Sequence, residues 1–266
     1  MWDGWLCFLV HAVHAVHAGT DRHGGRGMIE VRDLTVRFGG VVPLDNMSVT
    51  MGVGTNGLIG PNGAGKTTFF NVLSGFVRPA SGSVTAFGDD LLKMPDFKRV
   101  RWGLRRTFQT EQAIANLSVY ENVLLVHEHS GAPPASRRDD VMQAVEFIGL
   151  GSKLNHAVGS LGAAERRLVE VARTVVGTPR LILLDEPAAG LPDDETAELG
   201  AIIMQIPERT GASVVLVDHD MTLVAVTCSH VTVLDFGIVI ADGATGDVLN
   251  DPRVMQAYLG TEEVSA

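Results

Sequence analysis

The first part of the chain carries apolar residues at alternate positions, which is typical of half-buried strands. Residues 29–31 and 34–38 show this period of two, and a Gly-Gly pair follows as a turn. Residues 41–51 and 83–87 continue the extended pattern, and a glycine closes the second of these segments. The N-terminal part of the chain is therefore predicted to be rich in β-strands.

The middle of the chain changes to a helical period. Between residues 121 and 148 apolar residues recur three or four positions apart, and Val141, Val145 and Ile148 share one face. Residues 131–134, with the sequence Gly-Ala-Pro-Pro, interrupt this region, so two helices are predicted. Apolar positions of this kind are ordinary core contacts, and we attach no function to them.

After residue 160, helical and apolar segments alternate. Residues 164–176 and 193–206 are predicted helices, whereas residues 181–184, 213–217 and 231–234 are short apolar runs of the kind that buried strands form. Buried strands that alternate with helices imply a mostly parallel sheet with helices on both faces. The predicted fold class is therefore α/β, with the middle helices as an insertion or subdomain.

The first 27 residues differ from the rest of the chain. Residues 5–10 are apolar, and His11, His14 and His17 repeat behind them. A signal peptide is one interpretation, but no Lys or Arg precedes the apolar part. A zinc site is another, but no fourth ligand is evident. We favour a disordered extension, or an upstream start with Met28 as the natural first residue.

Composition narrows the function classes. The 266 residues can form one or two domains, and the formal charge of −10 argues against a broad nucleic-acid-binding surface. Two cysteines, Cys7 and Cys228, make no disulfide framework and suit a reducing compartment. No apolar run approaches the roughly 20 residues that span a bilayer, so a membrane role must run through a partner.

Residues 60–68, Gly-Pro-Asn-Gly-Ala-Gly-Lys-Thr-Thr, carry the most specific chemistry in the chain. They fit a phosphate-binding loop, in which backbone N–H groups and the positive end of the next helix surround a polyphosphate. Lys66 is placed to reach the β- and γ-phosphates, and the Thr67 hydroxyl to ligate Mg²⁺. An apolar approach and an apolar helical stretch flank the loop, so a chance glycine-rich turn is a poor explanation.

Two later strand ends carry candidate catalytic groups. Asp185 and Glu186 follow the apolar run 181–184, and ligands bind at this end of strands in open α/β sheets. Asp185 is expected to hold Mg²⁺, directly or through water, and Glu186 to orient or deprotonate the attacking water. His219 follows the next strand and is expected to contact the γ-phosphate. An acidic strand end or a histidine alone is more often structural.

Gln109 lies just before the helical region, in the sequence Arg-Thr-Phe-Gln-Thr. Its amide could ligate Mg²⁺, contact the attacking water and report the nucleotide state to the helices that follow. On spacing alone, a surface glutamine in a loop remains the better explanation.

In this order, the phosphate loop, Gln109, the Asp185–Glu186 pair and His219 resemble the nucleotide-binding subunit of an ABC transporter, over about residues 28–260. The resemblance implies a P-loop ATPase cassette in residues 28–266. Such a cassette has a mostly parallel core sheet, an N-terminal antiparallel β subdomain and a helical subdomain at about residues 110–175. The loop sequences and the terminal Ala-Tyr-Leu-Gly are similar to the branched-chain amino acid group.

The resemblance also assigns roles to individual residues. Catalysis is expected from Lys66, Glu186 and His219, and Mg²⁺ is expected on Thr67, Gln109 and Asp185. An aromatic ring that stacks on adenine is placed at Phe38. The implied ATP contacts are Phe38, Gly60, Pro61, Asn62, Gly63, Ala64, Gly65, Lys66, Thr67, Thr68 and Gln109.

One segment departs from the family pattern. The family signature Leu-Ser-Gly-Gly-Gln is replaced at residues 161–165 by Leu-Gly-Ala-Ala-Glu. Gly162 cannot donate the side-chain hydrogen bond of the serine, and Glu165 could bring negative charge toward the γ-phosphate bound to a dimer partner. The hypothesis is a heterodimer with a second ATPase subunit, whose intact signature completes one site.

The resemblance implies an ATPase subunit of an importer, peripheral on the cytoplasmic face of the plasma membrane. It would act with integral membrane permease subunits and, indirectly, a solute-binding protein, on branched-chain or related amino acids or a polar solute such as urea. The alternative is a non-transport ATPase that acts as a soluble assembly factor. A kinase with the same loop would leave Gln109, residues 161–165 and His219 unexplained.

Overall fold

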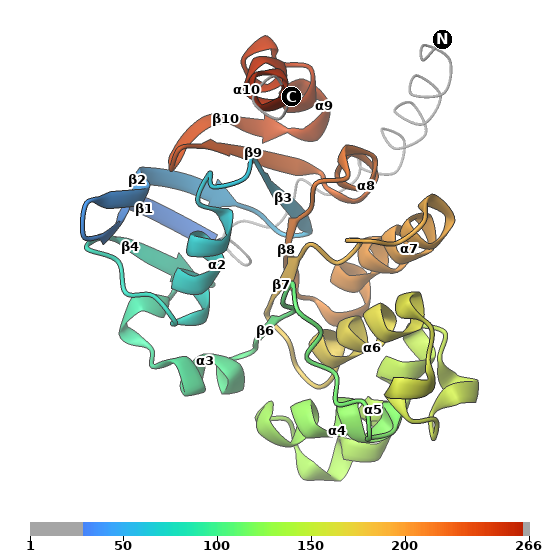
Figure 1. Ribbon diagram of the computed structural model, residues 1–266. Helices are drawn as coiled ribbons and strands as arrows, with labels where there is room; N and C mark the ends of the chain where they lie inside the picture. Colours follow the sequence, from blue (N-terminus) through green and yellow to red (C-terminus); the bar gives the residue numbers. More distant parts are fainter. Residues whose placement is uncertain (1–28, 263–266) are drawn as a thin grey trace.

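The computed structural model describes residues 29–262. The expected extension at residues 1–27, with its three histidines and Cys7, lies outside the described residues, as do residues 263–266. Figure 1 shows two sheets on one side of the molecule and a group of helices below and beside them.

A four-stranded antiparallel sheet forms the N-terminal unit, in the order β2-β1-β4-β5. This confirms the predicted antiparallel β subdomain. The first strand is continuous, although its apolar pattern predicted two pieces. Asp33 takes a left-handed φ of 50°, and the register to β2 shifts between Val31 and Leu34, so the strand bends without ending. The strands are β1 (Ile29–Phe38), β2 (Val41–Met51), β4 (Ser81–Ala86) and β5 (Asp89–Asp90).

The core sheet has six strands in the order β10-β9-β3-β8-β7-β6, and every neighbouring pair except β10 and β9 is parallel. The predicted mostly parallel sheet is therefore confirmed. Two strands were not predicted: β6 is three residues long and contains two arginines, and β10 lacks a strict alternation. The strands are β3 (Thr55–Ile59), β6 (Leu104–Arg106), β7 (Leu181–Asp185), β8 (Ser213–Val217), β9 (His230–Asp235) and β10 (Ile238–Ala244).

The predicted middle helices form. The short helices Asp96–Trp102, Met221–Thr227 and Thr245–Leu249 were not predicted. Ser118 caps α4 through a reciprocal pair with Glu121, so the helix begins before the predicted start. The helix predicted to end at residue 206 continues through Pro207 to Thr210. The helices are α2 (Lys66–Ser74), α3 (Asp96–Trp102), α4 (Val119–His129), α5 (Arg137–Phe147), α6 (Ala163–Val175), α7 (Asp193–Thr210), α8 (Met221–Thr227), α9 (Thr245–Leu249) and α10 (Pro252–Glu262).

The core sheet separates two hydrophobic cores. Successive strand residues point to opposite faces, so Leu58 joins one core and Ile59 the other. The first core lies between the sheet, the N-terminal strands and α2, and the second lies between the sheet and the later helices. Burial of each such side chain contributes about 1.5–3 kcal/mol. The C-terminal ends of β3, β7 and β8 are thus held rigidly, and the candidate residues follow them.

Candidate nucleotide site

The phosphate loop runs from the end of β3 to the start of α2, as the motif requires. Gly60 and Gly65 have φ values of 148° and 109°. A Cβ at Gly60 would lie 2.0 Å from the Leu234 carbonyl oxygen, and one at Gly65 would lie 2.3 Å from the Pro43 carbonyl oxygen. These two positions therefore require glycine, because the loop backbone presses against its neighbours.

The turn between β9 and β10 supports the loop from behind. Gly237 donates its N–H to the Ala64 carbonyl at 2.9 Å, and its own carbonyl accepts from Asp45 at 3.0 Å. A Cβ at Gly237 would lie 2.7 Å from the Pro43 carbonyl oxygen. Gly65 and Gly237 thus both pack against this one carbonyl group, which lies in β2. The shape of the loop depends on residues far from it in sequence.

Lys66 folds back over the loop. Its Nζ donates to the carbonyls of Gly60 at 2.5 Å and Pro61 at 3.0 Å, and only 6% of the residue is exposed. Burial lowers the pKa of Lys66, and the charges of Glu186 and Asp185 oppose this shift. A phosphate in the loop can replace these carbonyl partners, so the ammonium group is close to where the sequence predicts it to act.

Asp185 ends β7 in an almost fully buried ion pair with Arg106, whose Nη2 lies 2.8 Å from Asp185 Oδ2. Burial raises the pKa of Asp185, and the hydrogen bond and charge of Arg106 oppose this shift. The second oxygen, Oδ1, is buried and has no hydrogen-bond partner. Thr67 lies exposed at the start of α2. Carboxylate and hydroxyl oxygens are ligands that Mg²⁺ accepts, so these residues fit the cation.

Glu186, Gln109 and His219 converge at the same sheet edge. Glu186 Oε1 lies 3.0 Å from Gln109 Nε2 and 3.0 Å from His219 Nε2. Glu186 has a left-handed φ of 49° and donates its N–H to the Val217 carbonyl at 2.7 Å. A non-glycine residue in this conformation is strained by roughly 1–3 kcal/mol, and such strain clusters at functional sites. Three predicted residues from separate segments thus meet at one carboxylate oxygen.

Several residues of this site were not predicted as participants. Arg106 pairs with Asp185, and Thr107 accepts the Asp185 N–H at 2.9 Å on its hydroxyl. Asp218 is buried and accepts the N–H groups of Ala188 and Asp220. Burial raises the pKa of Asp218, although these hydrogen bonds oppose the shift. The position of Arg106, three residues before the predicted Gln109, was a usable signal, but its distance of 79 positions from Asp185 hid the pairing.

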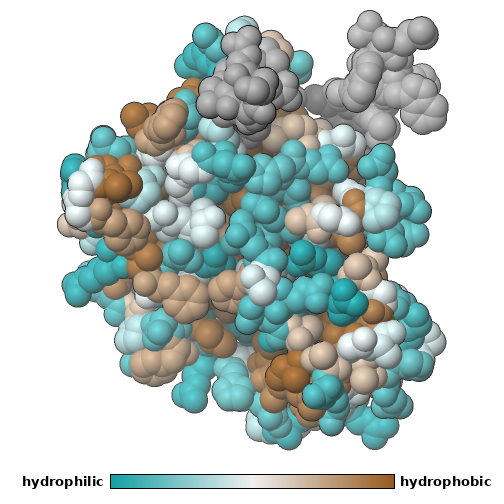
Figure 2. Space-filling view, viewed as in Figure 1, coloured by the Kyte–Doolittle hydropathy of each residue, from teal (hydrophilic) through white to brown (hydrophobic). Residues whose placement is uncertain are grey.

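Phe38 stands apart from the catalytic residues, at the end of β1 with 54% of its surface exposed. Val41, which pairs with it in the register of β1 and β2, is also exposed. Figure 2 shows apolar side chains at the left edge of the molecule, where Figure 1 places the turn between these strands. The ring is free to stack on a base, and its assignment to adenine stays a prediction.

The altered signature begins α6, and its carboxylate is not free. Glu165 pairs with Lys153, and its second oxygen accepts the Gly162 N–H at 3.2 Å. The Lys153 hydrogen bond is the main reason why the pKa of Glu165 lies below its usual value. Lys153 therefore offsets the charge of Glu165 within the same chain, and the approach of Glu165 to a partner's γ-phosphate stays a prediction.

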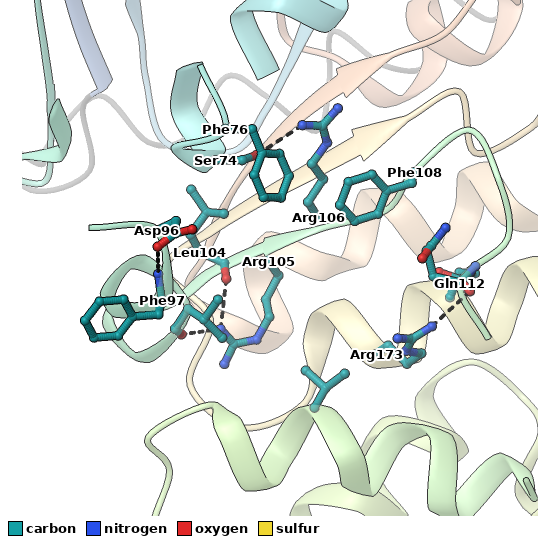
Figure 3. Close-up of a pocket in the computed structure, with 13 residues that line it drawn as sticks. Ser74, Phe76, Asp96, Phe97, Leu104, Arg105, Arg106, Phe108, Gln112 and Arg173 are labelled. Carbon is teal, nitrogen blue, oxygen red and sulfur yellow. Dashed lines mark hydrogen bonds and ion pairs between the residues drawn. The ribbon is translucent and has the colours of Figure 1, made fainter. Parts of the chain in front are cut away.

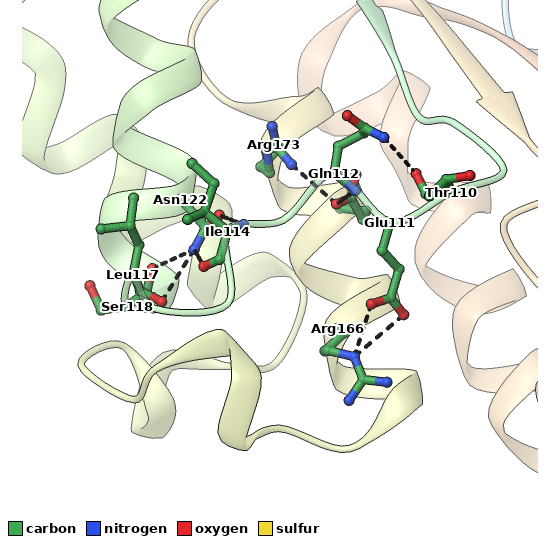
Figure 4. Close-up of polar contacts among 10 residues, drawn as sticks. Thr110, Glu111, Gln112, Ile114, Leu117, Ser118, Asn122, Arg166 and Arg173 are labelled. Carbon is green, nitrogen blue, oxygen red and sulfur yellow. Dashed lines mark hydrogen bonds and ion pairs between the residues drawn. The ribbon is translucent and has the colours of Figure 1, made fainter.

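Polar contacts connect the segment after Gln109, residues 110–118, to helices α4 and α6 (Figure 4). Glu111 pairs with Arg166 of α6 at 3.0 Å, and the Gln112 N–H donates to Glu170 of the same helix at 2.9 Å. Asn122 of α4 accepts the Ile114 N–H at 2.7 Å and donates to three carbonyls of the segment. Polar contacts therefore connect the segment that follows Gln109 to both α4 and α6.

A cavity of about 330 Å³ lies beside this segment (Figure 3). Phe76 and Phe97 contribute exposed rings to its lining. Arg105 is 4% exposed and donates Nη1 to the Val100 and Leu104 carbonyls, but its Nε and Nη2 are buried without a partner. Burial lowers the pKa of Arg105 to about 10, so it remains cationic at neutral pH. The cavity combines apolar rings with an incompletely paired cation.

Comparisons with known proteins identify the chain. The family model of the ABC transporter matches residues 44–189, and that of the branched-chain amino acid ATP-binding cassette transporter matches residues 239–264. The chain is 35% identical to the high-affinity branched-chain amino acid transport ATP-binding protein BraF of Pseudomonas aeruginosa, over 88% of this chain and 98% of the relative. It is also 35% identical to LivG of Escherichia coli, with the same two coverages.

Other relatives and solved structures agree with this result. The lipopolysaccharide export system ATP-binding protein LptB of Haemophilus influenzae is 33% identical over 77% of this chain and 86% of that protein. An ATP-binding cassette of an ABC transporter in its ADP conformation superposes with a TM-score of 0.79 at 26% identity, over 88% of this chain and 99% of that one. The chain belongs to the ABC transporter family and is one of its ATP-binding, ATP-hydrolysing cassettes.

Proposed function

We propose that this ATPase drives the uptake of branched-chain or related amino acids through separate permease subunits, from the cytoplasmic face of the plasma membrane. The match of residues 239–264 to the branched-chain cassette model carries the proposal, because it separates this group from other ABC transporters. The names of BraF and LivG support the same cargo class. No helix within residues 29–262 is long and apolar enough to cross a membrane.

The site geometry supports separate roles in hydrolysis for the residues that bind phosphate, bind Mg²⁺ and activate water. The loop N–H groups and Lys66 hold the phosphates, and Thr67, Gln109 and Asp185 are the proposed Mg²⁺ ligands. Mg²⁺ supplies charge neutralisation on the phosphate oxygens. Glu186 orients or deprotonates the attacking water, and release of Gln109 and His219 frees its carboxylate for that role.

The cavity beside the Gln109 segment is the proposed permease contact. Phe76 and Phe97 offer apolar contacts, and the unpartnered atoms of Arg105 call for an anion. A permease segment with apolar residues and one carboxylate meets both requirements. Because Gln109 contacts Glu186 and its segment is tied to α4 and α6, occupancy of this cavity and the state of the nucleotide site are coupled.

The proposed partner within the transporter is a second, different ATPase subunit. Residues 161–165 lack the serine hydroxyl of the usual signature, and Lys153 offsets only the charge of Glu165. A partner with an intact signature would complete the site that contains Lys66 and Glu186. A solute-binding protein would take part indirectly, by delivering cargo to the permease.

Reconstituted transport tests the proposal. The chain would be co-expressed with the two permeases and the second ATPase, placed in proteoliposomes, and supplied with MgATP, the solute-binding protein and labelled leucine. We expect ATP-dependent leucine uptake that disappears with Lys66→Ala. ATP turnover that leucine and its binding protein never stimulate, together with no co-purification of the permeases, would favour a soluble assembly factor instead. Full activity of the isolated homodimer would contradict the heterodimer.

A further inference from the structure

Arg106 enters the nucleotide site from the strand that leads into the Gln109 segment. It ends β6, and its Nη2 donates to Asp185 Oδ2 at 2.8 Å, with 5% and 2% of the two side chains exposed. Its Nη1 donates to Asn71 Oδ1 at 2.8 Å and to Ser74 Oγ at 3.2 Å. One guanidinium therefore joins α2, which starts at the phosphate loop, to the end of β7.

Two aromatic rings lie within cation–π distance of this guanidinium. Its carbon lies 5.4 Å from the centre of the Phe70 ring and 4.8 Å from that of Phe108. Figure 3 shows Arg106 and Phe108 projecting from the same stretch of chain, which leads toward Gln112. The planar fork of arginine can stack and donate in several directions at once, which the ammonium group of lysine cannot do. The orientation of Arg106 is thus restrained by aromatic contacts as well as by hydrogen bonds.

The contacts of Asp185 leave one oxygen available. Its N–H donates to the Thr107 hydroxyl at 2.9 Å, and Arg106 occupies Oδ2. Oδ1 is buried and has no partner. A buried carboxylate oxygen without a partner is costly and requires an explanation. A cation or one of its bound waters would satisfy Oδ1, while Arg106 prevents the carboxylate from turning away.

We propose that Arg106 is a positioning residue for metal binding, which holds Asp185 Oδ2 so that Oδ1 faces the cation that accompanies ATP. The proposal rests on ATP binding by this cassette and not on its cargo. Its readout is the Mg²⁺ dependence of the isolated chain, so a failed uptake assay would leave it standing.

The test compares Arg106→Gln and Arg106→Lys with the matched control Arg99→Gln. Arg99 also donates to α2, to the Val72 and Leu73 carbonyls at 2.6 Å each, but it has no contact with Asp185. Binding of a fluorescent ATP analogue to each purified chain would be measured first in EDTA and then as Mg²⁺ is titrated in. Thermal unfolding and circular dichroism would monitor the fold.

We expect Arg106→Gln to bind the analogue normally in EDTA, but its Mg²⁺ midpoint should rise about tenfold. Removal of a residue that holds a metal ligand in place typically lowers metal affinity by about this factor. Arg106→Lys should shift in the same direction, because it keeps the charge and loses the fork. Arg99→Gln should lower the unfolding temperature without changing the Mg²⁺ midpoint. If Arg106→Gln does not fold, Arg106→Lys decides by the same criteria. An unchanged midpoint, an equal shift in the control, or loss of binding in EDTA would overturn the proposal.

Discussion

At the scale of single residues, Glu186 is the centre of the site. Its backbone is strained, and its carboxylate is shared by Gln109 and His219. The Lys66 ammonium is turned onto loop carbonyls. We expect a bound nucleotide and its attacking water to replace these contacts of Lys66 and Glu186.

Replacement of Glu186 tests the assignment of the general base. Glu186→Gln keeps the size of the side chain and the oxygen that Gln109 and His219 contact, but it removes the basic carboxylate. We expect ATP turnover of the assembled transporter to fall by about 100-fold or more, with nucleotide binding retained. Glu208→Gln, an exposed change near the far end of α7, is the control. Turnover that survives Glu186→Gln would assign the base elsewhere.

At the scale of elements, α6 begins with an altered signature and a compensating pair. Lys153 ends the short helical turn Gly151–Lys153, which follows α5, and it pairs with Glu165 at the point where the partner's phosphate is expected. The N-terminus of α6 therefore keeps its positive dipole without a competing bare carboxylate. The carboxylate that departs from the family pattern is therefore paired with a lysine of the same chain.

Removal of the Lys153 side chain should slow ATP turnover and leave the fold intact. Lys153→Met exposes the Glu165 charge to a γ-phosphate bound by the second ATPase, so we expect several-fold slower ATP turnover in the assembled pair. Double substitution with Glu165→Gln should restore the rate. Lys93→Met, which breaks the exposed pair of Lys93 with Asp90, is the control. A single variant as active as the double variant would show that the charge of Glu165 does not matter.

Some of these elements could be predicted from the sequence and others could not. The phosphate loop and the two strand ends were predicted because their residues are contiguous and follow short apolar runs. The strand β6 was missed, since three residues with two arginines give no periodic signal. The pairing of Arg106 with Asp185 was missed for another reason: it depends on the neighbouring positions of β6 and β7 in the sheet. Local patterns reveal elements, whereas sheet order decides which side chains meet.

At the scale of the whole molecule, two cores on opposite faces of one sheet hold the site. Residues from β3, β7 and β8 contribute to both cores, so the strands that lead to Lys66, Asp185 and His219 are packed on both faces. Ligand binding at their ends is therefore expected to stabilise the entire described chain.

Thermal unfolding with nucleotide measures this linkage. MgATP at 100 times its dissociation constant should stabilise the folded state by about 2.7 kcal/mol and raise the unfolding temperature. Lys66→Ala should lose most of this gain, because it removes the cation that contacts the phosphates, whereas the exposed change Lys98→Ala should retain it. Equal temperature rises in all three proteins would mean that the nucleotide binds outside the loop.

The packing of Gly65 and Gly237 against the Pro43 carbonyl has a consequence for genetics. A random screen for strains that no longer grow on the transported nutrient should yield alleles at codon 237, although this codon lies 171 positions after Lys66. An added methyl group there would push Pro43 onto the loop and close the space that the triphosphate needs. Suppressor mutations should then cluster in β2, where the displaced carbonyl could relax.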